Sequence, residues 1–332
     1  MARAIELILA TSVSIGVGVG AARYAQPSAA ADFGDRPGAA YLSRHFLHDA
    51  VTAPAAEIGA QARALGLGAL YPFAGSVDAS GALVLADEGR SVHGGQVEPF
   101  AAGAATAGVA VYPWVAVVEG SRFDARDPAA RAAVAQTVAA LATASTAGVH
   151  LQVPAADPTG ALLLVGEVRG RLPAGKRLSV ATPPPPAPLA APDQAAWSAD
   201  QLAAACELAD HLVVHIEDRG LPATIYAPTL IGWTELLAAT LPPPAEGGCT
   251  WSFVVPVEDR PHPWHDPEVE NPSFVLPVLK HAFGGRTLPA GAAGPTLQGA
   301  WLMGGHEWAT WEQAWLDRDP GAPRIAEPMP GG

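Results

Sequence analysis

Strand-like and helix-like segments alternate along most of the chain, from about residue 40 to residue 316. Such alternation within one domain is typical of a parallel sheet whose crossover connections are helices. The alternation favours an α/β fold, a single (β/α)8 TIM barrel, over a doubly wound sheet. A doubly wound sheet usually carries a glycine-rich phosphate loop after its first strand, and Leu47-His48-Asp49-Ala50 stands there instead. The expected strands lie in 40–46, 69–73, 109–115, 148–157, 178–181, 211–216, 250–257 and 299–303.

The N-terminal segment has the layout of a secretory signal peptide. Arg3 precedes an apolar stretch at 5–22, and small residues at 28–31 offer a cleavage site. An uncleaved N-terminal anchor is the alternative. The resulting division is a signal peptide at 1–31, a linker at 32–39, the barrel at 40–318 and a loose C-terminal tail at 319–332. This division predicts a secreted protein, or one of the periplasm or cell envelope, without stable membrane insertion once the signal peptide is cleaved.

The charge balance limits the partners. The chain has 19 basic and 32 acidic residues, a net charge of −13, and no local run of Lys or Arg. This argues against nucleic acid or an anionic membrane surface as a partner. Cys206 and Cys249 are the only cysteines. Export would permit a disulfide between them, but Cys206 lies in a helical pattern and Cys249 begins a strand, so two buried thiols are the alternative.

Polar side chains interrupt the fourth strand at every second position. His150 and Gln152 alternate with Val149, Leu151 and Val153. Alternate side chains of a strand share a face, and a parallel barrel strand is buried on both faces. The two polar side chains therefore point together into the barrel, where they need partners.

The sixth strand carries a matching pair. His215 and Glu217 share a face, and if they point inward they meet His150 and Gln152 at the carboxyl ends of the strands, where barrel active sites lie. A one-residue change of register would reverse that face. A buried hydrogen-bonded His that only packs is the simpler interpretation of each histidine alone.

Two kinds of chemistry fit these strand ends. A metal-dependent hydrolase would use the strand-end histidines His48, His150, His215 and His306, but His45-x-x-His48 would place its two rings on opposite faces of a strand. Carbohydrate chemistry needs carboxyl groups, and Glu217, Glu258 and Glu307 supply them. Nine Trp is a high share, and Trp114 and Trp301 near strand ends suit stacking on sugar rings. Trp251, Trp264 and Trp308 lie near strand ends too, or fill the core.

The fourth strand resembles that of the chitinase-type barrels, glycoside hydrolase family eighteen. In chitinases it reads Asp-Gly-(Ile/Val)-Asp-(Leu/Ile)-Asp-(Trp/Tyr)-Glu. Gly148, Val149 and Leu151 match in kind, whereas His150 and Gln152 replace the two inward aspartates and Pro154 replaces the catalytic glutamate. At the end of the sixth strand, where chitinases commonly read Met-x-Tyr-Asp, only Asp218 fits. Trp301 falls where chitinases carry a Trp at the pocket floor.

The resemblance implies a chitinase-like barrel, similar to a poorly characterised bacterial branch, that is degenerate at its catalytic motif. Proline cannot act as a general acid. The expected function is therefore binding of a glycan or glycoconjugate with lost or altered hydrolysis, without a cofactor or metal. A metal-dependent hydrolase and a non-catalytic cell-envelope interaction protein are the alternatives. The candidate catalytic residues are Glu217, Asp218 and Glu258, and the candidate substrate-binding residues are His150, Gln152, His215, Trp114, Trp301 and Glu307.

Overall fold

The computed structural model describes residues 36–325 except 49–53, 79, 86–89, 92–95, 118–122, 188–194, 218, 247, 258–260, 262, 264, 285–288, 290 and 323. The predicted signal peptide at 1–31 lies outside the described residues, as do Asp218, Glu258 and Trp264. No helix in the described part of the chain is both long enough and apolar enough to cross a membrane.

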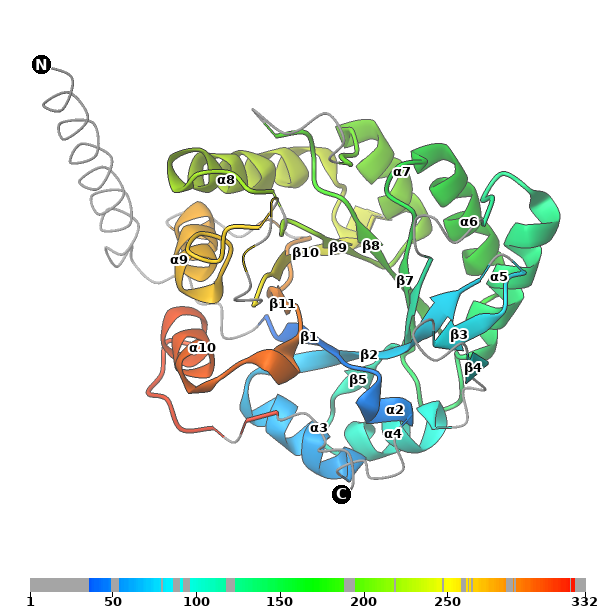
Figure 1. Cartoon of the computed structure of the whole chain (residues 1–332), viewed down its shortest axis with the longest axis horizontal. Coiled ribbons are helices and arrows are strands. Elements are labelled where there is room, and N and C mark those ends of the chain that lie inside the picture. The colour runs from blue at the N-terminus through cyan, green and yellow to red at the C-terminus, as the bar shows by residue number, and fades with distance from the viewer. Residues whose placement is uncertain are drawn as a thin grey trace, which may run out of the picture.

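Eight parallel strands close into a barrel, counting β5 and β6 as one interrupted strand (Figure 1). β1 pairs with both β2 and β11, which closes the ring, and the fold class predicted from the sequence is confirmed. The barrel strands are β1 (Gly38–Leu42), β2 (Leu67–Val77), β5 (Ala110–Val111), β6 (Trp114–Ala116), β7 (Gly148–Gln152), β8 (Arg177–Thr182), β9 (His211–Val214), β10 (Thr250–Val255) and β11 (Thr296–Leu297).

Helices surround the barrel on the outside, as the view down its axis shows (Figure 1). They are α3 (Ala55–Ala64), α4 (Val97–Ala105), α5 (Pro128–Ala140), α6 (Pro158–Arg171), α7 (Ala199–Leu208), α8 (Ala223–Thr240), α9 (Pro272–Phe283) and α10 (Gly305–Thr310). A short helix α2 (His45–His48), the 3-10 turns η1 (Pro244–Glu246) and η2 (Ala300–Leu302), and a π-helical turn η3 (Trp311–Trp315) complete the set with the hairpin strands β3 (Leu83–Leu85) and β4 (Arg90–Ser91).

Local sequence signals set several helix ends. A capping box starts α7: the Ser198 side chain accepts from the N–H of Gln201, and the Gln201 side chain accepts from the N–H of Ser198. Asp127 caps α5 by accepting from the N–H of Ala129, with Pro128 in the first turn. These residues satisfy N–H groups that have no partner inside the helix.

Two faces of each strand are buried. On the outer face, side chains such as Val149, Leu151 and Val180 join the large core under the helices. On the inner face, aromatic and small side chains fill the barrel, among them Ala39, Tyr41, Tyr71, Tyr112, Val213 and Val254. The first residue of β7, Gly148, must be a glycine, because a Cβ there would lie 1.8 Å from the Arg177 carbonyl oxygen.

Several predicted boundaries are wrong. The eighth strand is Thr296–Leu297, not 299–303, because Gly299 adopts the left-handed conformation at φ 62° and starts the turn η2. The first strand ends at Leu42, so His45 and His48 lie in α2 rather than on opposite faces of a strand.

Both ends of the described chain are more ordered than the predicted linker and tail. β1 begins at Gly38, inside the linker predicted at 32–39. The tail is not loose up to Ile325, which is 1% exposed. The N–H groups of Gly321 and Ala322 donate to the Glu312 carboxylate, which Arg318 also binds. A buried carboxylate with these donors fixes the segment against η3.

The structure resolves the open question about the cysteines. Cys206 of α7 and Cys249 before β10 form a disulfide that joins positions 43 residues apart, and no free cysteine remains. The bond ties the helix before β9 to the start of the next strand, β10.

We expect reduction of this disulfide to lower the free energy of unfolding. Release of a loop of this length removes up to about 4 kcal/mol by the chain-entropy estimate. Urea unfolding with and without a reducing agent measures the change. A Cys206→Ser/Cys249→Ser double variant should match the reduced wild type and be insensitive to the reductant. An unchanged midpoint on reduction would contradict a structural role for the bond.

Candidate functional site

A chain of hydrogen bonds runs through the barrel interior from β8 to β1. His150, which is fully buried, contacts Ser179 through Nδ1 at 2.8 Å and the Tyr41 hydroxyl through Nε2 at 2.8 Å. Its ring also stacks on Tyr71, with ring centroids 4.3 Å apart. The inward orientation predicted for His150 is therefore observed, and both of its ring nitrogens have partners.

The chain continues to the sixth barrel strand at the mouth. The Tyr41 hydroxyl lies 3.2 Å from Nε2 of His215, and Nδ1 of His215 bonds to Oε1 of Glu217. Glu217 is 5% exposed, and its second oxygen, Oε2, is buried without a hydrogen-bond partner among the described residues. A buried polar atom of this kind in a native structure needs an explanation.

Glu217 and His215 form part of a cavity at the carboxyl ends of the strands. Its volume is about 350 Å³, which suits a small ligand. The Trp114 indole N–H donates to Oε1 of Gln152 at 3.1 Å, which fixes both side chains at the wall. The described lining residues are Tyr41, Trp114, Gln152, His215, Glu217, Val257, Gln298, Gly299, Trp301 and Leu302.

Burial and neighbours set the charges of this interior. Burial, together with His215 and His211, holds the pKa of His150 well below its ordinary value, so this ring is neutral. Burial also raises the pKa of the Tyr41 hydroxyl well above its ordinary value. For Glu217, burial opposes ionisation, but His215 and Arg219 more than offset it and lower the pKa of the carboxyl group. Glu217 is thus ionised at neutral pH.

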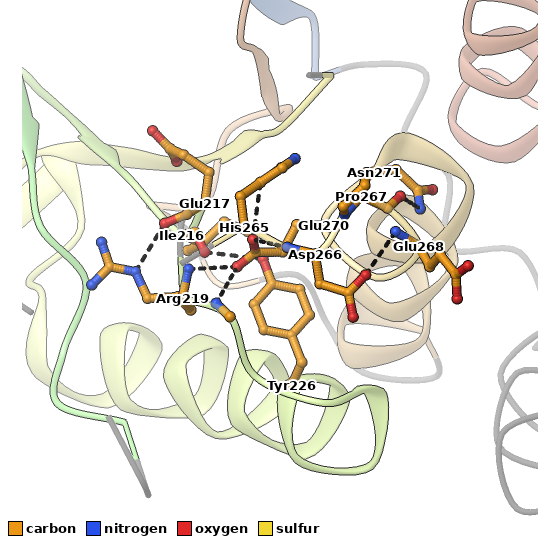
Figure 2. Close-up of polar contacts among 11 residues, drawn as sticks. Ile216, Glu217, Arg219, Tyr226, His265, Asp266, Pro267, Glu268, Glu270 and Asn271 are labelled. Atoms are coloured by element: carbon orange, nitrogen blue, oxygen red, sulfur yellow. Dashed lines mark hydrogen bonds and ion pairs between the residues drawn. The ribbon is translucent and has the colours of Figure 1, made fainter. Parts of the chain in front are cut away.

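A second buried carboxylate holds the segment after Glu217 (Figure 2). Glu270 is fully buried and accepts from the backbone N–H groups of Arg219 at 2.6 Å, Gly220 at 3.3 Å and Asp266 at 3.2 Å. Nδ1 of His265 lies 3.0 Å from its Oε2. Glu270 therefore ties the loop after β9 to the turn before α9.

Two further contacts fix the backbone around Glu217. The Tyr226 hydroxyl donates to the carbonyl of Ile216 at 3.0 Å, and Nε of Arg219 donates to the carbonyl of Glu217 at 2.9 Å. In Figure 2 the Glu217 carboxylate points away from this group of contacts. The backbone is held on one side while the carboxylate lies at the cavity.

The structure brings together six of the predicted site residues at the barrel mouth: His150, Gln152, His215, Glu217, Trp114 and Trp301. Glu307 lies instead in the first turn of α10 and does not line the cavity. Trp251 and Trp308 are core residues, each 1% exposed. Asp218 and Glu258 lie outside the described residues, so their catalytic role stays a prediction.

Several residues of this site were missed from the sequence. Tyr41 shares the inner face of β1 with Ala39, and the same alternation argument applied to the first strand would have found it. Ser179 is the residue of β8 that pairs with His150 of β7, so its place in the site follows from the strand register. Gln298 could not be found, because the eighth strand was placed three residues too late. Glu270 lies in an irregular segment that no periodicity marks.

The histidines proposed for a metal-dependent hydrolase do not converge. Nε2 of His48 lies 3.1 Å from the carbonyl oxygen of Ala74, and His306 is exposed on α10. Within the described ranges, no group of three or more His, Cys, Asp or Glu side chains could hold a metal ion.

Comparison with solved structures places this barrel among chitinase-type folds. The spore cortex-lytic enzyme SleL of Bacillus cereus matches with a TM-score of 0.56 at 12% identity, over 84% of this chain and 74% of that one. A chitinase of Chromobacterium violaceum matches with a TM-score of 0.52 at 15% identity, over 85% and 100%. The fold is a chitinase-type barrel.

A binding protein shares the same fold. The xylanase-α-amylase inhibitor protein XAIP-I, solved with trehalose, matches with a TM-score of 0.53 at 11% identity, over 86% of this chain and 99% of that one. No family model and no curated protein sequence matches the chain. The predicted resemblance to chitinase-type barrels is confirmed for the fold, and at these identities the likeness extends to the fold alone.

We expect Glu270→Gln to lower the free energy of unfolding by about 1–3 kcal/mol, because an amide offers one acceptor oxygen where the carboxylate offers two. Urea unfolding followed by circular dichroism measures the change. Glu268→Gln is the matched control, since that exposed side chain lies on the same turn, and it should shift stability by less than about 0.5 kcal/mol. Equal effects of the two substitutions would contradict the role of Glu270.

The inner histidines should make stability fall at acid pH. Burial lowers the pKa of His211 to about 4, with its ring held by Thr250 and Ser252. As pH falls from about 6.5 to about 4 the unfolded chain takes up a proton that the folded chain excludes, which costs up to about 3 kcal/mol. The lowered pKa of His150 also makes stability fall at acid pH. His211→Gln should flatten urea-unfolding stability against pH, whereas exposed His306→Gln should not.

Proposed function

We propose that this protein binds a glycan or glycoconjugate in the barrel-mouth cavity and does not cleave it by the chitinase-type mechanism. The observation that carries the proposal is the lining of one cavity by Trp114, Trp301, Gln152, Gln298 and Glu217. Oε2 of Glu217 is buried without a hydrogen-bond partner among the described residues. Trp114 and Trp301 offer apolar ring faces for the CH face of a sugar. Gln152, Gln298 and Glu217 offer hydrogen-bonding groups for hydroxyls.

Loss of chitinase-type hydrolysis follows from the chemistry at the strand ends. The position of the family's acid on the fourth strand holds Pro154, and the two inward aspartates are replaced by His150 and Gln152. A general acid in glycoside hydrolysis needs a raised pKa so that it carries a proton. The pKa of Glu217 is shifted in the opposite direction. Glu217 therefore suits an acceptor of hydrogen bonds rather than a proton donor.

The proposal also includes export of the protein from the cytoplasm. The N-terminal segment 1–31 has the layout of a secretory signal, and the Cys206–Cys249 disulfide is typical of an oxidising compartment. A secreted or cell-envelope location would place the cavity among extracellular polysaccharides.

A glycan-array experiment tests the proposal. We expect wild-type protein to bind at least one of chitin, peptidoglycan or a common bacterial polysaccharide. Trp301→Ala removes a large apolar contact and should weaken that binding by roughly tenfold, and Glu217→Gln should alter it too. Glu57→Gln, an exposed change on the outer helix α3, serves as the control and should have no effect. Absence of wild-type binding to every glycan would refute the proposal.

A further inference from the structure

The chemistry of the ligand can be inferred from the Glu217 carboxylate more closely than from the cavity volume. Nδ1 of His215 bonds to Oε1 of this carboxylate, whereas Oε2 is buried and has no hydrogen-bond partner in the part of the chain that the structure describes. A buried anionic oxygen without a donor is costly, so a ligand that supplies a donor there gains more than one that supplies none. A ligand that also supplies a positive charge gains further, because the interaction lies away from bulk water.

We propose that the barrel-mouth cavity binds a positively charged amino sugar, one whose amine is free and protonated, in preference to its N-acetylated form. This inference rests on the proposed function, and it adds the chemical class of the sugar unit that the cavity selects. The groups that carry it are the Glu217 carboxylate and the indoles of Trp114 and Trp301.

No cation among the described lining residues competes for Oε2. Apart from Glu217 and His215, the described lining consists of uncharged side chains. His150, below His215 in the barrel, is neutral. Arg219 lies on the other side of the segment, where its guanidinium donates to the carbonyls of Glu217 and Ala195. Asp218, Glu258, Asp259 and Arg260 lie outside the described residues.

The aromatic side chains of the cavity wall favour a positively charged ligand, as the carboxylate does. An ammonium group near the face of a Trp or Tyr ring is attracted to the ring's negative face. Trp114 is held by its bond to Gln152 and by edge contacts with Tyr41 and Phe73, at centroid distances of 4.9 and 4.7 Å. A cavity lined by a fixed indole and a carboxylate is a suitable place for a cation.

An N-acetyl group fits this environment less well. Its amide offers one neutral N–H donor, and its carbonyl oxygen would meet a carboxylate of like polarity. A protonated amine offers three donors and a full charge. Bonds to charged groups are stronger than neutral ones by an amount that corresponds to about a tenfold difference in affinity.

Isothermal titration of the full protein with tetraglucosamine and with its fully N-acetylated counterpart tests the preference. We expect the wild type to bind tetraglucosamine about tenfold more tightly, and higher ionic strength or a pH above the pKa of the sugar amine to reduce the difference. Glu217→Gln should abolish the preference while it retains binding of the N-acetylated form. Glu57→Gln should behave as wild type.

A gain-of-function variant keeps the test independent of any folding defect in Glu217→Gln. Gln298→Glu adds a second carboxylate to the cavity wall and should increase the preference for tetraglucosamine. A wild type that binds the N-acetylated form equally or more tightly would overturn the inference and leave the proposed function intact. If neither sugar and none of the arrayed glycans bound to the protein, the proposed function would be refuted. Binding of choline with no binding of any sugar would overturn both.

Discussion

The hydroxyl of Tyr41 lies between two histidines inside the barrel, and the polar interior depends on it. It contacts His150 on one side and His215 on the other, so it joins the buried ring below to the residues at the mouth. Because the buried His150 ring is neutral, one of its nitrogens donates and the other accepts, and Ser179 and Tyr41 supply the two partners. The chain of contacts then runs from Tyr41 through His215 to the ionised Glu217.

This arrangement explains how a strand whose inner face carries His and Gln folds in a barrel interior. A polar group in such a place is tolerated when it is hydrogen-bonded, and His150 has partners at both nitrogens. At the upper end of this chain, Oε2 of Glu217 has no hydrogen-bond partner among the described residues. The unmet hydrogen-bonding capacity therefore belongs to a residue that lines the cavity.

The sequence predicted most of this from periodicity, and failed where periodicity is absent. Alternation in 148–153 and 211–217 placed four polar side chains on one inner face, and they do meet or line one cavity. The same argument could not place Gln298, because a glycine in the left-handed conformation ended the eighth strand early. It could not find Glu270 either, since two of the backbone N–H groups that this carboxylate binds, those of Arg219 and Gly220, lie 51 and 50 residues earlier in the sequence. The roles of these residues in binding stay predictions.

The buried carboxylate at the mouth of this barrel, Glu217, lies in the segment after the sixth barrel strand. That segment is irregular, and irregular backbone is mobile unless its polar groups are bound. Glu270 and Tyr226 bind them from two neighbouring elements, which gives Glu217 a fixed position without a regular strand beneath it. A carboxylate held ionised by His215 and fixed by its backbone is suited to steady recognition of a donor. A residue that must gain and lose a proton during turnover needs a pKa near the working pH, whereas the pKa of Glu217 is lowered.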